Sequence, residues 1–341
     1  MVTLKDIAKR ANVNVSTVSR ALNDSSEINE DTKKMIRAIA AEMHYTPNMS
    51  ARALTGKGTM SIGIIIPEVI SGYFAQMVNF IEEELKAQSY SLIVGMTHHD
   101  YREEIHYMDV FAKRKVDGII LAFSMYKELE KSLHTMKNHY KMPMVLIQTF
   151  KHFPDYDYIV VDDMQGIDSA IRHLYELGHR DIGFIADQIS SKLRFEAFKQ
   201  GMKNSGLKVN DRFVKIGNEM FEEGGYLQAQ ELLNEKEMPT AIFAGYDHMA
   251  IGAMRAFQEH GLRVPEDISI IGYDNIREGA YLPIPLTTVS PPIRDMTRVG
   301  VKLLLDKIKE KDNAVIQHVS LKPELIIRNT TGACSKRNGT D

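Results

Sequence analysis

One short segment near the N-terminus carries the small polar and basic side chains that proteins use to contact DNA bases. Val18, Ala21 and Leu22 recur at helical spacing, which predicts a helix from residue 15 with these three residues facing inward. Its outward-facing residues are Val15, Ser16, Thr17, Ser19, Arg20 and Asn23. Arginine can donate two hydrogen bonds to guanine, so we expect Arg20 to read a base and Val15 and Ser16, at the start of the helix, to set base preference.

Two further predicted helices position this segment. Apolar residues at 4, 7, 8 and 11 form one helical face, and Asn14 is a good N-cap for the helix that follows. Asn29 caps a third helix, predicted over 30–43, so that three short helices can close a small core. Helix, short turn and helix with a polar outer face is typical of a helix-turn-helix, although most short amphipathic helix pairs bind no DNA.

A second set of polar residues follows apolar runs further along the chain. From residue 61, β-branched runs such as Ile62–Ile66 alternate with amphipathic helices, which predicts parallel sheets covered on both faces. The cycle continues past residue 240, which predicts two doubly wound lobes with a cleft between them. Such sheets bind ligands at the carboxyl ends of their strands.

The residues predicted at these strand ends suit a polyol ligand. They are Ser71, Tyr73 and Phe74 after the first strand, then Asp162 with Asp163, Arg194, Asp247 and Asp274. Carboxylates accept bonds from paired hydroxyls, arginine donates a fork of N–H groups, and aromatic faces cover the C–H surface of a sugar. An aspartate after a strand also often caps the next helix, and Arg194 could pair with Asp162 or Asp163 without any ligand.

Composition excludes several classes of protein. The 341-residue chain has no Walker phosphate-binding loop, no dinucleotide-binding glycine motif and no C-x-x-C pair, so we expect no enzyme activity and no cofactor. We interpret His98-His99 as a solvated loop rather than a metal site. With Cys334 as the single cysteine, no apolar run long enough to span a membrane and no signal peptide, we expect a cytoplasmic protein.

Charge is unevenly distributed along the chain. The overall formal charge is −3, but residues 1–58 hold nine Lys/Arg against six Asp/Glu, which leaves the rest of the chain acidic. A basic head on an acidic body is typical of a protein that touches phosphates with its head alone.

Several of these motifs occur together in one known family. They are Leu4–Ala8, Ala11–Val13, Thr17–Asn23, and Tyr45–Asn48 with Ala51 and Leu54. On these residues the chain resembles the lactose/galactose-repressor (LacI/GalR) family of bacterial transcription regulators, and the likeness extends to about Gly332. Asn14 stands where the family usually has serine, a change between two good N-caps.

The resemblance implies further DNA contacts and an assembly. It implies a hinge helix that folds on DNA, with Asn48 and Ala51 in it and Leu54 wedged into the minor groove. Thr3 and Asn29 complete the predicted DNA-contact set. It also implies a homodimer on a pseudo-palindromic double-stranded operator, and we expect the apolar helix 74–88 at the subunit interface, because its apolar residues exceed what one face needs.

The resemblance also implies that Arg194, Asp247 and Asp274 bind a small effector. Tyr246 replaces the family's common asparagine and would reshape a sugar site, and Val161 replaces an aromatic that stacks on purines in some relatives, although Phe221 could supply such stacking. Asp162 completes the predicted effector set. The sequence does not identify the effector.

The sequence thus predicts an all-α head over 1–46, a hinge and linker over 47–60, a two-lobed α/β body over 61–332 and a disordered tail over 333–341. The first lobe is expected over about 61–160 and 291–320, and the second over about 161–290 and 321–332. The predicted function is an effector-responsive DNA-binding repressor, with a carbohydrate-use operon as its target. The alternative is a sugar-binding protein or lobe-closing enzyme of the same fold without a DNA role.

Overall fold

A computed structural model describes residues 2–45, 58–124, 126–149, 153–310 and 315–335. The chain divides into two compact units, Met1–Thr59 and Met60–Asp341. The hinge residues Asn48, Ala51 and Leu54 lie outside the described residues. None of the helices in the described part of the chain is long and apolar enough to cross a membrane.

The first unit is a three-helix head built from α1 (Leu4–Ala11), α2 (Val15–Leu22) and α3 (Glu30–Glu42). Ile7, Val18 and Ile36 are fully buried, one from each helix, and hold the three together. Asn14 occupies the N-cap of α2 as predicted, but its side chain makes no capping hydrogen bond. Val18 and Ala21 are buried in this core and Leu22 packs against it, which confirms the predicted inward face of α2.

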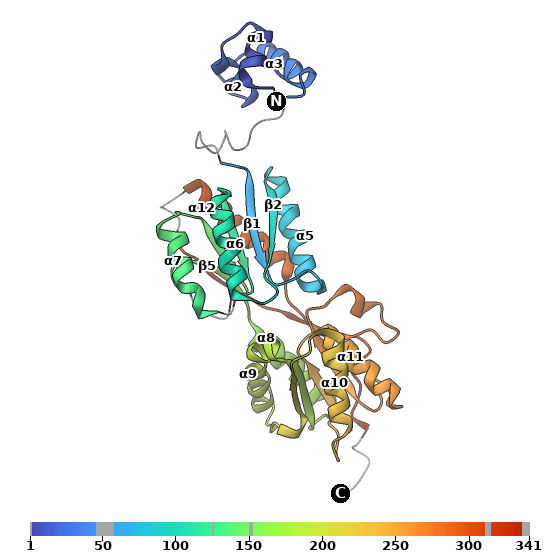
Figure 1. Ribbon diagram of the computed structural model, residues 1–341. Helices are drawn as coiled ribbons and strands as arrows, with labels where there is room; N and C mark the ends of the chain where they lie inside the picture. Colours follow the sequence, from blue (N-terminus) through green and yellow to red (C-terminus); the bar gives the residue numbers. More distant parts are fainter. Residues whose placement is uncertain (1, 46–57, 125, 150–152, 311–314, 336–341) are drawn as a thin grey trace. The chain divides into compact units, whose positions relative to one another are not determined.

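The first lobe of the second unit is a parallel sheet with the strand order β11-β5-β4-β3-β1-β2 (Figure 1). Helices α5 and α12 pack on one face and α6 and α7 on the other. The strands are β1 (Ser61–Ile66), β2 (Ser91–Met96), β3 (Gly118–Ala122), β4 (Met144–Ile147), β5 (Asp157–Val161) and β11 (His318–Leu321). The helices are α5 (Gly72–Ala87), α6 (Tyr101–Lys113), η1 (Lys127–Leu129), α7 (Glu130–Asn138) and α12 (Ile293–Glu310).

The second lobe has the strand order β12-β10-β9-β8-β6-β7, with β12 as its antiparallel strand. Helices α10 and α11 cover one face and α8 and α9 the other. The strands are β6 (Ile182–Asp187), β7 (Val214–Gly217), β8 (Ala241–Ala244), β9 (Ser269–Tyr273), β10 (Thr287–Ser290) and β12 (Glu324–Ile326). The helices are α8 (Asp163–Glu176), α9 (Gln188–Asn204), η2 (Asp211–Phe213), α10 (Phe221–Leu233), α11 (Asp247–Glu259) and η3 (Arg277–Ala280).

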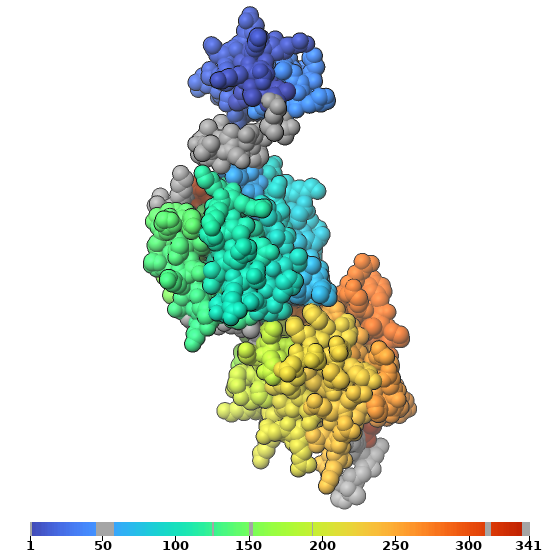
Figure 2. Space-filling model, in the orientation of Figure 1, coloured from blue at the N-terminus to red at the C-terminus, as the bar shows by residue number. Residues whose placement is uncertain are grey.

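Three chain segments pass between the lobes: β5 to α8, β10 to α12, and β11 to β12. In Figure 2 the cyan-to-green surface of the first lobe meets the yellow-to-orange surface of the second along one boundary. The predicted fold class, a helix-turn-helix head with two parallel-sheet lobes, is confirmed.

Some local predictions need correction. The sequence reading missed β7 and β10: β7 is a short edge strand that includes a lysine, and β10 has prolines on both sides. Helix α9 begins at Gln188, so Arg194 lies in its second turn and not at a strand end. The predicted disordered tail also begins too early, because the Cys334 N–H donates to the Leu177 carbonyl at 2.9 Å.

The apolar residues of α5 do not form the free surface that the sequence suggested. Phe74, Met77, Ile81 and Leu85 are all buried in the core of their own lobe, where α5 packs against α12. Helix α5 has more apolar residues than one face needs because it is buried against both the sheet and α12. Packing within the lobe therefore explains the apolar composition of α5, and a subunit interface on this helix stays a prediction.

Candidate functional site: a cavity between two lobes and a polar helix face

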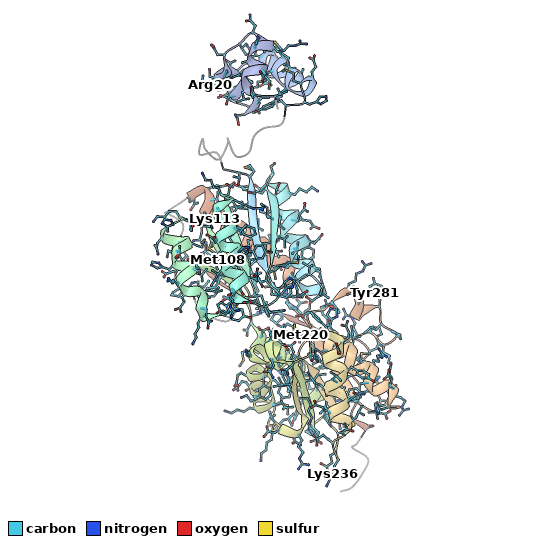
Figure 3. The ribbon with its side chains drawn as sticks, in the orientation of Figure 1. Arg20, Met108, Lys113, Met220, Lys236 and Tyr281 are labelled. Carbon is cyan, nitrogen blue, oxygen red and sulfur yellow. The ribbon has the colours of Figure 1, made fainter. Side chains whose placement is uncertain are left out.

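A cavity of about 60 Å³ lies where the two lobes meet, and residues of both lobes line it. Met220, labelled in Figure 3, marks its position at the boundary. The lining consists of Glu68, Ser71, Tyr73, Phe74, His99, Phe123, Gln148, Asp187, Ile189, Ser190, Arg194, Met220, Phe221, Tyr246, Tyr273, Asp274 and Pro291. Ligand pockets usually exceed about 300 Å³, so a sugar-sized ligand requires the lobes or the lining side chains to move apart.

A buried ion pair forms the floor of this cavity. Arg194 Nη2 donates to Asp274 Oδ1 at 3.1 Å, Nη1 donates to the Gly245 carbonyl, and the guanidinium lies 3.7 Å above the centre of the Tyr273 ring. Burial raises the pKa of Asp274 to about 6, and the Arg194 charge limits the rise. Burial alone would lower the pKa of Arg194, but Asp274 and the neighbouring groups more than offset it, so the guanidinium stays charged.

Tyr273 extends this cluster toward the first lobe. Its hydroxyl donates to Asp163 Oδ1, at the start of α8, and Asp163 Oδ2 accepts a hydrogen bond of 3.4 Å from Gln148 Nε2. Gln148 follows β4 in the first lobe, and its Oε1 accepts the N–H of Val161. A continuous set of polar contacts therefore joins the cavity floor to the segment that crosses between the lobes.

Backbone strain is concentrated around the cavity. Five of its lining residues have the left-handed backbone that side-chain-bearing residues rarely adopt: His99 (φ 61°), Phe123 (φ 64°), Gln148 (φ 53°), Phe221 (φ 58°) and Asp274 (φ 107°). Such conformations cost about 1–3 kcal/mol each and cluster at ligand sites. Phe123, Gln148 and Asp274 directly follow the carboxyl ends of β3, β4 and β9.

The structure brings together seven of the nine residues predicted for the effector site. Those that line the cavity are Ser71, Tyr73, Phe74, Arg194, Phe221, Tyr246 and Asp274. Asp162 does not line it, because Asp162 caps α8 by accepting the Gln165 N–H at 3.0 Å. The alternative that the sequence left open, an aspartate capping the next helix, describes Asp162.

Asp247 is also outside the cavity lining. It is fully buried, its Oδ1 accepts the Thr288 hydroxyl at 2.6 Å, and its Oδ2 accepts the Ile276 N–H at 2.8 Å. Burial raises its pKa well above the usual value for a carboxyl. Asp247 therefore joins α11 to β10 and to the loop after β9, and we remove it from the set of direct ligand contacts.

The sequence reading missed other lining residues, of which Asp187 is the most informative. Asp187 directly follows the apolar run Ile182–Ala186 and is the last residue of β6. A polar residue at the carboxyl end of a strand is the same signal that identified Asp162 and Asp274, but the apolar run predicted for this strand was too short to reach Asp187. His99 was interpreted as part of a solvated loop, but it lines the cavity, and burial lowers its pKa. No group of side chains among the described residues could hold a metal ion.

The outer face of α2 has the exposure that contact with DNA requires. Val15, Ser16 and Arg20 are exposed, and Thr17 and Ser19 are half-buried. Arg20, labelled in Figure 3, pairs with Glu27 at 2.8 Å, and both side chains remain more than half exposed. Asn23 donates to the Ser19 carbonyl and closes the end of the helix.

Thr3 and Asn29 have capping partners of their own. The Thr3 hydroxyl donates to Asp6 in a capping box at the start of α1, and the Asn29 side chain accepts the Thr32 N–H at the start of α3. Both are exposed.

Comparison with known proteins identifies the family. Residues 3–48 match "Bacterial regulatory proteins, lacI family", and residues 171–331 match "Periplasmic binding protein-like domain". The Klebsiella pneumoniae "HTH-type transcriptional repressor PurR" is 36% identical over 334 residues, 96% of each chain. The chain belongs to the LacI family. A Haemophilus influenzae repressor of the same name is also 36% identical, over 96% of this chain and 98% of its own.

Solved structures of LacI-family proteins share the fold. A lac repressor dimer bound to operator and an anti-inducer has a TM-score of 0.88 at 27% identity, over 97% of this chain and 99% of its own. A LacI-family regulator from Enterococcus faecium with bound ribose has a TM-score of 0.71 at 27% identity, over 80% and 99%. This LacI-family chain is accordingly a DNA-binding transcriptional repressor, not an enzyme.

Proposed function

We propose that this LacI-family repressor changes its operator affinity when a carbohydrate binds in the cavity between its lobes, and that it controls a carbohydrate-use operon. The observation that carries the proposal is the convergence of Arg194, Asp274 and a wall of aromatic side chains on one cavity lined from both lobes. Buried donors and acceptors beside aromatic faces suit a sugar, which has hydroxyls on its edge and C–H groups on its faces. The ribose bound by the Enterococcus faecium relative supports this class of ligand.

The mechanism follows from the position of the cavity. The cavity is smaller than a usual ligand pocket, so binding requires its walls to move apart, and we propose that a change in lobe separation makes the room. An effector can shift an equilibrium only by its differential affinity for two states, and the lobe separation supplies those states. The contacts from Asp274 through Tyr273 and Asp163 to Gln148 would transmit the change to the crossing segment.

We also propose that the repressor acts as a homodimer on a pseudo-palindromic operator. β2 is an edge strand of the first sheet, and its Val94 and Met96 are 39% and 38% exposed, which suits a partner better than water. The lac repressor relative is described as a dimer bound to operator. Sedimentation of the full chain at micromolar concentration should give a dimer, and a monomer or a stable tetramer would contradict this proposal.

The test of function uses operators selected from random DNA by the full chain. The selected sites should contain two related half-sites, and a gel shift with them should respond to one or more neutral sugars. Failure to select any sequence would refute the operator proposal, and selected binding that ignores every sugar would refute the carbohydrate effector.

A further inference from the structure

Asp187 has an unused carboxylate oxygen at the cavity. The residue ends β6, is 1% exposed, and caps α9 through Oδ1, which accepts the N–H groups of Ile189 and Ser190, both at 2.7 Å. Its Oδ2 is buried and has no hydrogen-bond partner among the described residues. A buried carboxylate oxygen without a donor costs folding free energy, so this oxygen is suited to a group that arrives with a ligand.

The other acidic residues of the cavity are already engaged. Glu68 holds the loop before α5: Oε2 accepts the Ser71 N–H at 2.8 Å and Oε1 accepts the Ser71 hydroxyl at 2.6 Å. Asp274 is paired with Arg194. The Tyr246 hydroxyl accepts the Phe221 N–H at 2.8 Å and interacts with the Asp187 carboxylate through its own O–H, but no donor among the described residues lies within hydrogen-bond geometry of Oδ2.

Two further unpaired atoms belong to residues that line the same cavity. Ser190 Oγ and His99 Nε2 are buried and have no hydrogen-bond partner in the part of the chain that the structure describes. Glu68, Asp187 and Asp274 face a single guanidinium in the lining, so the cavity carries a formal excess of two negative charges. A second anion would enter this field unfavourably, whereas a hydroxyl or ammonium group would find acceptors.

We propose that Asp187 is the specificity-determining residue of this effector site: Oδ2 accepts a hydrogen bond from a hydroxyl or ammonium of an uncharged or amino sugar, and the cavity rejects sugar phosphates and sugar acids. The inference rests on the proposed carbohydrate effector and names its class. Ser190 and His99 supply neighbouring polar contacts.

The first arm of the test needs no ligand. Asp187→Asn retains the Oδ1 acceptor that caps α9 and replaces the unpaired carboxylate oxygen Oδ2 with an uncharged NH₂ group. Because a buried charge without a partner is thereby removed, the ligand-free full chain should melt at the wild-type temperature or above it. A clear fall in melting temperature would mean that Oδ2 has a structural partner and would overturn the proposal. Asp187→Ser, which keeps an N-cap side chain and deletes Oδ2, provides a second variant.

The second arm measures binding of glucose, glucosamine, ribose, glucose 6-phosphate and ribose 5-phosphate to the full chain by calorimetry. A neutral or amino sugar should bind more tightly than the phosphate esters, and Asp187→Asn should weaken it roughly tenfold to a hundredfold. Glu196→Gln, at an exposed position on the same helix, should leave the affinity unchanged. Tighter binding of a phosphate ester, no binding of any probe at millimolar concentration, or unchanged affinity of Asp187→Asn would each overturn the proposal.

The two proposals fail in different ways. Loss of sequence-selected DNA binding refutes the regulatory proposal without affecting the calorimetry. An anion that binds the cavity and alters DNA affinity refutes the role of Asp187 while leaving an effector-responsive repressor.

Discussion

Replacing Arg194 with alanine is expected to destabilise the body substantially, because the substitution leaves Asp274 buried without its partner. The side chains of Arg194 and Asp274 are 7% and 11% exposed and lie 3.1 Å apart. At an effective dielectric constant of about 20, unit charges at that distance attract by about 5 kcal/mol. Removing one member of a buried pair typically costs about 3–5 kcal/mol, because the other charge stays buried.

An ion pair in an open, solvated cleft would cost little stability to lose, whereas this pair is buried. For a body of this size, about 3–5 kcal/mol corresponds to a fall in melting temperature of roughly 6–20 °C. Because the chain has no tryptophan, far-UV circular dichroism is the suitable signal for thermal and urea unfolding.

The double variant Arg194→Met, Asp274→Leu distinguishes the cost of leaving one charge buried without a partner from the cost of losing the ion pair itself. It removes both charges, so it should be more stable than Arg194→Ala although it has lost the same ion pair. Arg172→Ala, which breaks an exposed pair on α8, should change stability by less than about 1 kcal/mol. If Arg194→Ala melts within about 2 °C of wild type, the pair is effectively solvated and the argument is refuted.

Three further predictions concern other parts of the chain. Arg20→Ala should lose about 1–3 kcal/mol of discrimination between a selected operator and one with a changed guanine, and equal loss on both sites would contradict base reading. Burial raises the pKa of Glu104 to about 8 from a usual 4.5, so the folded state binds more protons between these values and stability falls as pH rises across them. Glu104→Gln should therefore flatten the dependence of melting temperature on pH, whereas the exposed neighbour Glu103→Gln should not. Gly252→Ala should destabilise the second lobe, because the added Cβ would meet the Glu222 carbonyl where α11 crosses α10, and Arg255→Ala on the same helix should not.

Local sequence was sufficient for most elements and for the fold class. The inward stripe of Val18, Ala21 and Leu22 and the outward polar residues of α2 follow from helical periodicity, which depends on a few neighbouring positions. The β-branched runs of the central strands are buried on both faces, so their composition alone marks them. β7 is half-buried and includes a lysine, and β10 is a four-residue run between prolines, so local composition does not separate these two strands from loops.

The site was only partly predictable for the same reason. Strand-end position identified Asp162, Asp247 and Asp274 equally, since nothing in the local sequence separates an aspartate that caps a helix from one that faces a ligand. The tertiary structure separates them: Asp162 caps α8, Asp247 is enclosed by Thr288 and Ile276, and Asp274 meets Arg194 from 80 residues away. Sequence determines which groups are available, whereas the packing of the lobes decides which donors and acceptors remain unpaired at the cavity.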